Sequence, residues 1–226
     1  MFVEPATVDP EGNARKLAAN PKLKIPPHPR WILDGNDRAI DFEQEGLNFY
    51  RRVRKYLAAV FYNDVVTYLP SHTIRKAYLR LFGATIGKDS TIMRGTSVWD
   101  IEYLTIGDRT YIGDRCLLDC RAGLAIGDNV VIASDTHIIG ARHAVNHRDF
   151  LAVIAVPLVI EDYVWIARRA MILPSHVHRG AVVAEQATVT GDVGELEIVA
   201  GTPARAIGKR NPDALKCSGK MRPEFA

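Results

Sequence analysis

Ile86-Gly87-Lys88-Asp89 returns as Ile106-Gly107-Asp108-Arg109 and then as Ile126-Gly127-Asp128-Asn129, twenty residues apart each time. From each copy an aliphatic residue recurs at six-residue steps, and a small or modest residue follows most of these four positions later. The aliphatic series is Ile86, Ile92, Val98; Ile106, Ile112, Leu118; Ile126, Ile132, Ile138; and Ile160, Ile166, Ile172. A period of six fits neither an α-helix nor a simple strand, whose periods are about 3.6 and 2.

Such a period, with two interleaved inward positions, is typical of a hexapeptide-repeat β-helix. Three short strands form one triangular coil of about eighteen residues, and the spacing of twenty adds two residues at a corner. The aliphatic residue fills the prism, and the small one lets the backbone turn beside it. We therefore predict an all-β solenoid, a parallel β-helix, over residues 84–201.

A helical segment and an arm precede this solenoid. Residues 1–46 are polar and rich in proline, so we predict an extended arm with little structure of its own. Residues 47–83 are predicted to be helical, because apolar residues recur there at three- and four-residue steps from Leu47. Pro70 should end the first helix, Ser71 should cap a second, and Gly83 should lie at its C-terminal end.

Charge is distributed unevenly, although the formal net charge is only +3. Residues 50–83 carry seven Lys or Arg against one acid, residues 84–200 carry ten against fifteen, and residues 201–226 carry six against two. The last segment is predicted to be a basic tail from residue 202. Basic patches suit phosphate groups or a membrane surface; solvated surface charge is the alternative. For residues 50–62, contact with anionic lipid competes with packing against a neighbouring coil.

Several classes of protein are excluded. No stretch approaches the roughly 20 apolar residues of a membrane-spanning helix, and the longest apolar run is broken by Pro157. The N-terminus lacks the regions of a secretory signal. Cys116, Cys120 and Cys217 have no metal-ligand spacing, and we interpret them as reduced thiols of a cytoplasmic protein. No nucleic-acid partner is expected.

The repeat that ends in Thr136–His143 and the repeat that begins at Pro157 give the most specific signal. About fourteen extra residues leave the prism between them, over residues 140–155, and a loop of this length in a regular solenoid is usually functional. Here the chain resembles the hexapeptide-repeat acyltransferases, most closely the sugar O-acetyltransferases of the galactoside, maltose and colanic-acid-biosynthesis type. The resemblance covers residues 84–207. It implies a left-handed β-helix, a homotrimer with active sites between subunits, and a catalytic histidine at position 143.

Acyl transfer from a thioester to a sugar hydroxyl needs a base near neutral pKa, which a histidine supplies. His143, at the root of the loop, is the predicted base, and Asp119, one coil earlier, is expected to help position the acceptor. A surface histidine is the alternative for His143. His147 is interpreted as solvated, and His137 is placed outside the prism. We predict no metal site. Histidines that bind a metal between subunits of such a fold would lie on successive coils, whereas these three cluster on one coil and its loop.

The resemblance also implies acetyl coenzyme A as co-substrate, bound along the C-terminal coils. Trp165-Ile166-Ala167 matches the family's Trp-Ile-Gly element, so Trp165 and Ala167 would line the channel. Residues 198–205 match its closing motif, so Arg205 would meet a phosphate of coenzyme A.

The chain departs from the family pattern where small residues face the pantetheine arm. Arg168-Arg169 and Glu185-Gln186 stand there, with Arg168 and Glu185 beside the channel. His176 and His178 occupy positions normally held by a small residue and an inward isoleucine.

We predict transfer of an acetyl group to a hydroxyl of a sugar or saccharide precursor, without an acyl-enzyme. A metalloprotein like the γ-class carbonic anhydrases and a non-catalytic trimeric scaffold are the alternatives.

Overall fold

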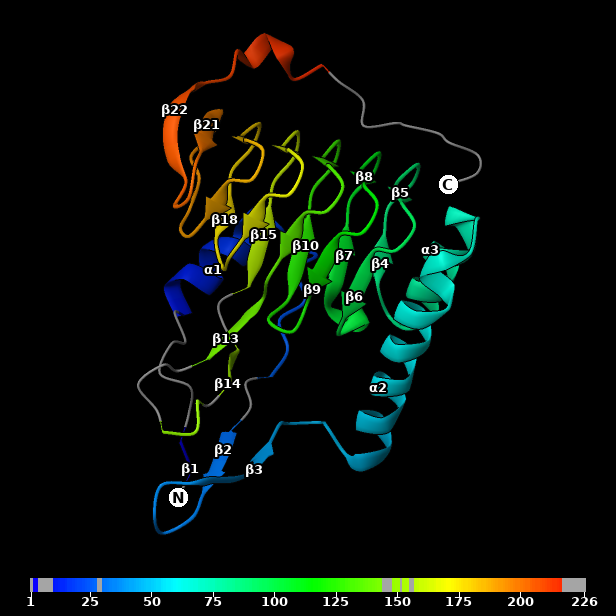
Figure 1. The fold of residues 1–226 in the computed structure, drawn as a ribbon, viewed down its shortest axis with the longest axis vertical. Coiled ribbons are helices and arrows are strands. Elements are labelled where there is room, and N and C mark those ends of the chain that lie inside the picture. The colour runs from blue at the N-terminus through cyan, green and yellow to red at the C-terminus, as the bar shows by residue number, and fades with distance from the viewer. Residues whose placement is uncertain are drawn as a thin grey trace.

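Three parallel sheets form the sides of a prism in the computed structural model, which describes residues 2–3, 10–27, 30–143, 148–150, 152–154 and 157–216 (Figure 1). We call them the first, second and third faces, in the order in which the chain visits them. The first face contains β4 (Thr85–Ile86), β7 (Leu104–Ile106), β10 (Leu124–Ile126), β15 (Leu158–Ile160) and β18 (His176–Val177). The second contains β5 (Thr91–Ile92), β8 (Tyr111–Ile112), β11 (Val131–Ile132), β16 (Trp165–Ile166), β19 (Val182–Val183), β21 (Glu197–Ala200) and β22 (Arg205–Lys209). The third contains β6 (Ser97–Trp99), β9 (Leu117–Asp119), β12 (His137–Ile138), β17 (Met171–Ile172) and β20 (Thr188–Val189).

The aliphatic series of the sequence fills this prism. Ile106 pairs with Ile86 and Ile126 across the first face, and the other members of the series pair in the same way on their faces. None of these side chains is more than 7% exposed. The predicted left-handed parallel β-helix is confirmed, and its six-residue period follows from inward positions stacked from coil to coil.

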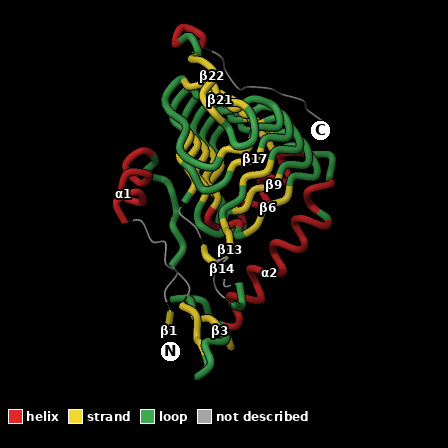
Figure 2. The backbone as a smooth tube through the Cα atoms, turned by 60° about the vertical axis from the view of Figure 1, so that its left-hand side comes forward, coloured by secondary structure: helices red, strands yellow, loops and turns green. Residues whose placement is uncertain are grey.

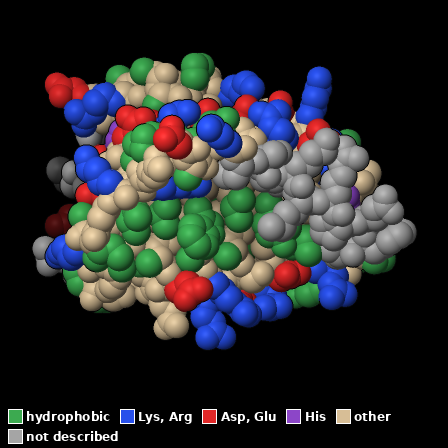
Figure 3. All heavy atoms as spheres, turned by 90° about the horizontal axis from the view of Figure 1, so that it is seen from above, with side chains coloured by type: hydrophobic (Ala, Val, Ile, Leu, Met, Phe, Trp, Pro, Cys, Tyr) green, Lys and Arg blue, Asp and Glu red, His purple; other side chains and the backbone are tan. Residues whose placement is uncertain are grey.

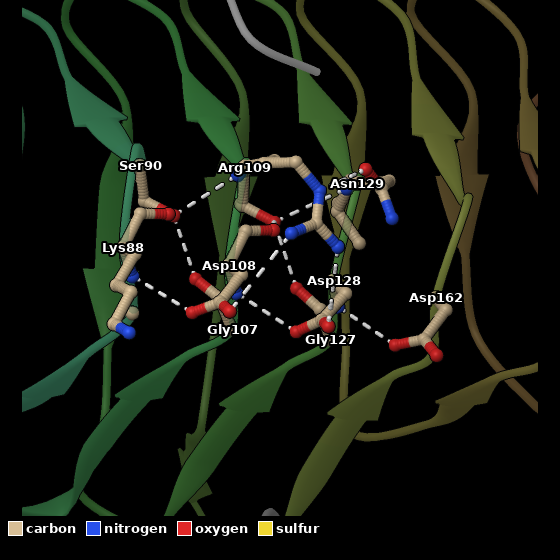
Figure 4. Close-up of polar contacts among 12 residues, drawn as sticks. Lys88, Ser90, Gly107, Asp108, Arg109, Gly127, Asp128, Asn129 and Asp162 are labelled. Atoms are coloured by element: carbon tan, nitrogen blue, oxygen red, sulfur yellow. Dashed lines mark hydrogen bonds and ion pairs between the residues drawn. The ribbon is translucent and has the colours of Figure 1, made fainter. Parts of the chain in front are cut away.

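An aspartate ladder follows the corner between the first and second faces (Figure 4). The N–H of Lys88 donates to Oδ1 of Asp108 over 2.7 Å, that of Asp108 to Asp128 over 2.8 Å, and that of Asp128 to Asp162 over 2.7 Å. A Cβ on Gly107 would lie 2.2 Å from Oδ1 of Asp128. Glycine therefore precedes these corner positions because the carboxylate of the next coil occupies the space of a side chain.

Small polar residues complete the corners. Their hydroxyl groups donate to carbonyl oxygens of the following coil over 2.6–3.2 Å. The donors are Ser90, Thr96, Thr110 and Thr136. A larger side chain would neither fit beside the turn nor satisfy these buried carbonyl groups.

The prediction that residues 1–46 form an extended arm with little structure of its own is wrong. Residues 1–46 contain the helix α1 (Pro10–Ala19) and an antiparallel sheet of β1 (Phe2–Val3), β2 (Arg30–Leu33) and β3 (Ala39–Glu43). Leu23 is buried against Ala125 and Val159 of the first face, and Nζ of Lys16 donates to the carbonyl of Pro157 over 2.7 Å. A few anchors on the solenoid thus order a polar segment, which runs beside the coils in Figure 2.

The predicted helical segment forms α2 (Phe49–Asp64), η1 (Val66–Tyr68) and α3 (His72–Leu81). Asn48 caps α2 through its side chain, which accepts from the N–H of Arg51 over 2.9 Å. Ser71 stands at the cap of α3 without a side-chain hydrogen bond. Gly83 follows α3 with a φ of +100°, a conformation that favours glycine. Tyr62 and Leu79 join these helices to the core of the prism.

The two ends of the stack are closed by different elements. At the first coil, α3 packs against β5 and α2 against β6. At the last, β22 turns back antiparallel onto β21, so the predicted tail begins with a strand. The 3-10 helix η3 (Pro212–Ala214) follows. Within the ranges given above, no helix is long and apolar enough to cross a membrane.

Candidate active site

His143 stands on a hairpin that leaves the prism after β12. Its strand β13 (Ala141–His143) pairs antiparallel with β14 (Ala152–Ile154), and His143 lies opposite Ala152. The side chain is exposed, and its Nδ1 lies 2.6 Å from the carbonyl oxygen of Phe150. A carbonyl oxygen only accepts, so Nδ1 is the donor in this hydrogen bond, and the lone pair of a neutral ring is then on Nε2. This is the tautomer that a general base requires.

Asp119 lies beside the root of the hairpin. A Cβ on Gly140 would come within 2.4 Å of the carbonyl oxygen of Asp119, so the chain can leave the coil here only with glycine. The buried carboxylate of Asp119 is held by Arg121, with Nε and Nη2 each 2.8 Å from one of its oxygens. Hydrogen bonding to Asp119 raises the pKa of Arg121. Among the described residues, no hydrogen bond joins Asp119 to His143.

The N-terminal sheet contacts the inserted segment. Oδ2 of Asp149 accepts the N–H of Ala39 over 2.8 Å, and Nη1 of Arg148 donates to the carbonyl of Asn36 over 2.9 Å. The turn between β2 and β3 therefore braces the segment that carries His143. No sequence signal indicates this contact, because it joins residues more than a hundred positions apart. His147 lies outside the described residues.

Trp165, Ala167 and Arg168 follow one another on the second face and at its corner with the third. Trp165 is half-exposed and Ala167 is buried. Nε and Nη2 of Arg168 lie 2.9 and 2.8 Å from Oδ2 of Asp135, and Nε of Arg115 lies 2.8 Å from Oδ1. Arg115 and then Arg168 hold the pKa of Asp135 down to about 2. The guanidinium of Arg168 is therefore directed along this corner.

The remaining candidates lie on the last coils. Glu185 is exposed in the turn after β19, and Arg205 is exposed on β22, where its Nη1 donates to the carbonyl of the adjacent Ala204 over 2.9 Å. The candidates thus form two groups. His143 and Asp119 follow the third face, whereas Trp165, Ala167, Arg168, Glu185 and Arg205 lie on the second face and the turns beside it. Within the ranges that the structure covers, no hydrogen bond or ion pair joins the two groups.

The predicted positions of His176 and His178 are wrong by one residue. Val177 pairs with Ile160 and is fully buried in the prism, so the two histidines lie on the outside. The cause is a shorter turn, since Val177 follows Ile172 by five residues instead of six. The departure from the family pattern at Arg168-Arg169 and Glu185-Gln186 is present in the structure. Arg169 and Gln186 occupy turns with φ of +61° and +58°, where glycine is favoured.

The parallel β-solenoid matches the fold of the left-handed β-helix acetyltransferases. No protein-family model matches the chain. Its sequence is 29% identical over 137 residues to the putative colanic acid biosynthesis acetyltransferase WcaF of Escherichia coli, covering 60% of this chain and 75% of that protein.

Solved structures of acetyltransferases are similar to this chain as well. The hexapeptide-repeat-containing acetyltransferase of Vibrio cholerae, complexed with acetyl coenzyme A, matches with a TM-score of 0.63 and 27% identity over 74% of this chain and 92% of that one. A maltose O-acetyltransferase from Clostridium difficile matches with a TM-score of 0.63 at 22% identity, over 71% and 86% of the two chains, and shows the fold alone. In sequence and in fold, the chain is therefore similar to the hexapeptide-repeat acetyltransferases.

Proposed function

We propose that this acetyltransferase moves the acetyl group of acetyl coenzyme A to a hydroxyl of a sugar or saccharide precursor, with His143 as general base. The observation that carries the proposal is the hydrogen bond from Nδ1 of His143 to the carbonyl of Phe150. It leaves Nε2 free to take a proton, which supports the role of base that the family resemblance implies for His143. Asp119 would act on the acceptor through Arg121, which holds both of its carboxylate oxygens.

In this mechanism Nε2 of His143 takes the proton of the acceptor hydroxyl while the oxygen of that hydroxyl attacks the thioester carbon. The Phe150 carbonyl stabilises the imidazolium through Nδ1–H. A backbone N–H would stabilise the oxyanion. As the C–S bond breaks, the imidazolium returns its proton to the departing sulfur.

A covalent acyl-enzyme on the buried cysteines is unfavourable. Cys116 and Cys120 point into the prism and are at most 1% exposed. Burial raises the pKa of Cys116 to about 11 and that of Cys120 well above its usual range, so neither forms the thiolate that a nucleophile needs. Their free state supports the proposed cytoplasmic location. Cys217 lies outside the described residues.

We also propose a homotrimer. The N-terminal arm covers the first face, but the second face presents an outward row of Tyr111, Val131, Trp165, Val182 and Ile198. Figure 3, viewed from the side of β22, β21, β8 and β5, shows apolar side chains along the middle of this face. Packing against neighbouring copies would cover this row and bring His143 of one chain toward Trp165 of the next.

Light scattering at micromolar concentration should therefore give a particle of three chains of 25.1 kDa each. The apolar row predicts self-association, and closed symmetry limits its size. A monodisperse monomer would remove the shared active site.

Replacing Arg205 with alanine should weaken the binding of acetyl coenzyme A by about 5–150-fold, equivalent to about 1–3 kcal/mol. The reason is the loss of a charge-assisted contact with a phosphate. Calorimetry measures the affinity for acetyl coenzyme A. The matched control is Lys209→Ala, which removes another positive charge from the same strand. If the unmodified protein binds no acetyl coenzyme A, the donor assignment fails and the fold remains.

Contact of residues 50–62 with a membrane surface is proposed from the exposed side of α2. Tyr50, Tyr56, Leu57 and Phe61 are each more than half exposed, beside basic residues of the same helix. Such a surface should bind anionic vesicles more strongly at low salt. Flotation with anionic and neutral liposomes tests this, and Tyr56→Ser with Leu57→Ser should abolish binding. Equal recovery with neutral vesicles would contradict it.

A further inference from the structure

Two imidazole groups and a carboxylate meet on the last coils, where the first face ends. Glu161 follows β15, His176 lies on β18, and His178 comes directly after that strand. Nε2 of His176 and Nδ1 of His178 lie 2.7 and 3.3 Å from the same oxygen, Oε1 of Glu161. The three ligand atoms all lie within 4.8 Å of one another. The group contains neither of the residues of the proposed acetyl-transfer site, His143 and Asp119.

The fold holds these side chains in place. Alternate residues of a strand share a face, so with Val177 inward both histidines project outward, and their rings stack with centroids 3.9 Å apart. Oε2 of Glu161 accepts the N–H of Arg179 over 2.8 Å, which leaves Oε1 to face the imidazoles. Oδ1 of Asp192 accepts the N–H of His176 over 2.7 Å and fixes the strand.

The surroundings of the three side chains favour a metal ion bound through coordinate bonds over a cation held by charge alone. A cavity of about 600 Å³ separates the group from α1, and Arg15, Lys16 and Asp192 line it. The two cations offset the two carboxylates, Glu161 and Asp192, so the local field attracts no cation by itself. The guanidinium of Arg179 lies over the ring of Tyr163. Imidazole nitrogen binds zinc and its neighbours, whereas calcium and magnesium require oxygen ligands.

We propose that Glu161, His176 and His178 bind one divalent transition-metal ion of the zinc type. In a tetrahedral zinc site, bonds of about 2.0–2.1 Å set neighbouring ligand atoms about 3.3 Å apart. The separation between Nδ1 of His178 and Oε1 of Glu161, 3.3 Å, matches this value. The separation between Nε2 of His176 and the same oxygen, 2.7 Å, is that of a hydrogen bond, and it would lengthen when an ion takes the place of the shared proton. The cavity leaves a fourth position to water. The ion would tie the coil of β15 to the coil of β18, and it is independent of the proposed acetyl transfer.

The test uses the full chain without an affinity tag, freed of metal by a chelator and titrated with Zn²⁺ in a calorimeter. One ion should bind per chain, and Co²⁺ in its place should show the visible absorption of a tetrahedral complex. His178→Ala and Glu161→Gln should each weaken zinc binding by at least about 100-fold, since even outer-shell changes cost 10–100-fold. Glutamine keeps an acceptor for Arg179, so the metal-free variant should stay folded by circular dichroism.

His137→Ala is the matched control, because His137 is an exposed histidine on another face; its zinc affinity should be unchanged. Absence of stoichiometric zinc binding in the unmodified chain overturns the proposal, and the group is then a hydrogen-bonded network only. Unchanged affinity in both His178→Ala and Glu161→Gln overturns it as well.

Discussion

His143→Ala should lower turnover by about 10²–10⁴-fold, the usual contribution of a general base. Without the imidazole, the acceptor hydroxyl keeps its proton as it attacks the thioester, and the Phe150 carbonyl loses its donor. Substrate affinity and the particle mass from light scattering should change little, because the side chain is exposed and contributes nothing to the prism core. Coenzyme A release, followed with the true acceptor or with water in its place, measures the effect.

His137→Ala and His147→Ala are the controls for this variant, and each should lose less than about tenfold, below the contribution of a general base. His137 projects from β12 at the surface. If His143→Ala retains turnover and His147→Ala abolishes it, the assignment of the base along the loop is wrong. The base then lies four residues further along the chain.

Gly107→Ala should destabilise the fold by about 1–3 kcal/mol or more, as overpacking of a filled site does. The new Cβ would lie 2.2 Å from Oδ1 of Asp128 and 2.6 Å from the backbone of Gly127, and backbone atoms cannot move aside as a flexible side chain can. For a chain of this length, the midpoint of thermal unfolding should fall by about 2–12 °C. Calorimetry or circular dichroism measures the shift.

Gly208→Ala provides the matched comparison, because a Cβ there meets nothing within 4 Å. It should change the free energy of unfolding by no more than about 0.5 kcal/mol. Asp128→Ala alone removes the acceptor of the Asp108 N–H, but combined with Gly107→Ala it should cost less than the sum of the two. Equal destabilisation by Gly107→Ala and Gly208→Ala would show that the aspartate ladder is not the reason for the glycine.

The solenoid was predictable because its information is local and repeated. Each aliphatic position, such as Ile106, has the same environment one coil away, so a periodic pattern determines both burial and register. Where the repeat changed length, prediction failed: the turn after Ile172 is one residue shorter, and so Val177 and not His178 enters the core. The length of a turn depends on backbone geometry, and the identities of its residues give little indication of it.

The site was predictable only in part. The family resemblance, together with the interruption of the repeat, predicted His143 as the base. Its hydrogen-bond partner, the carbonyl of Phe150, could not be predicted, because every residue has a backbone carbonyl group. The same holds for the brace at Asn36 and Ala39, whose contacts use main-chain groups. For the arm, composition indicated polarity correctly, but a few scattered residues such as Leu23 and Lys16 attach it to the solenoid. So few anchors give no periodic pattern in the sequence.

A stack of parallel coils has no intrinsic length, since its last strands offer unpaired N–H and C=O groups to any further coil. In a crowded solution those groups are a template for end-to-end growth of fibres from identical chains. Here α2 and α3 cover the first coil, and β22 pairs with the edge of β21 in the opposite direction. An antiparallel strand cannot continue a parallel ladder in register, so these two ends make the chain a particle of finite size. A chain shortened before Arg205 would regain an open edge, and with it a tendency to aggregate.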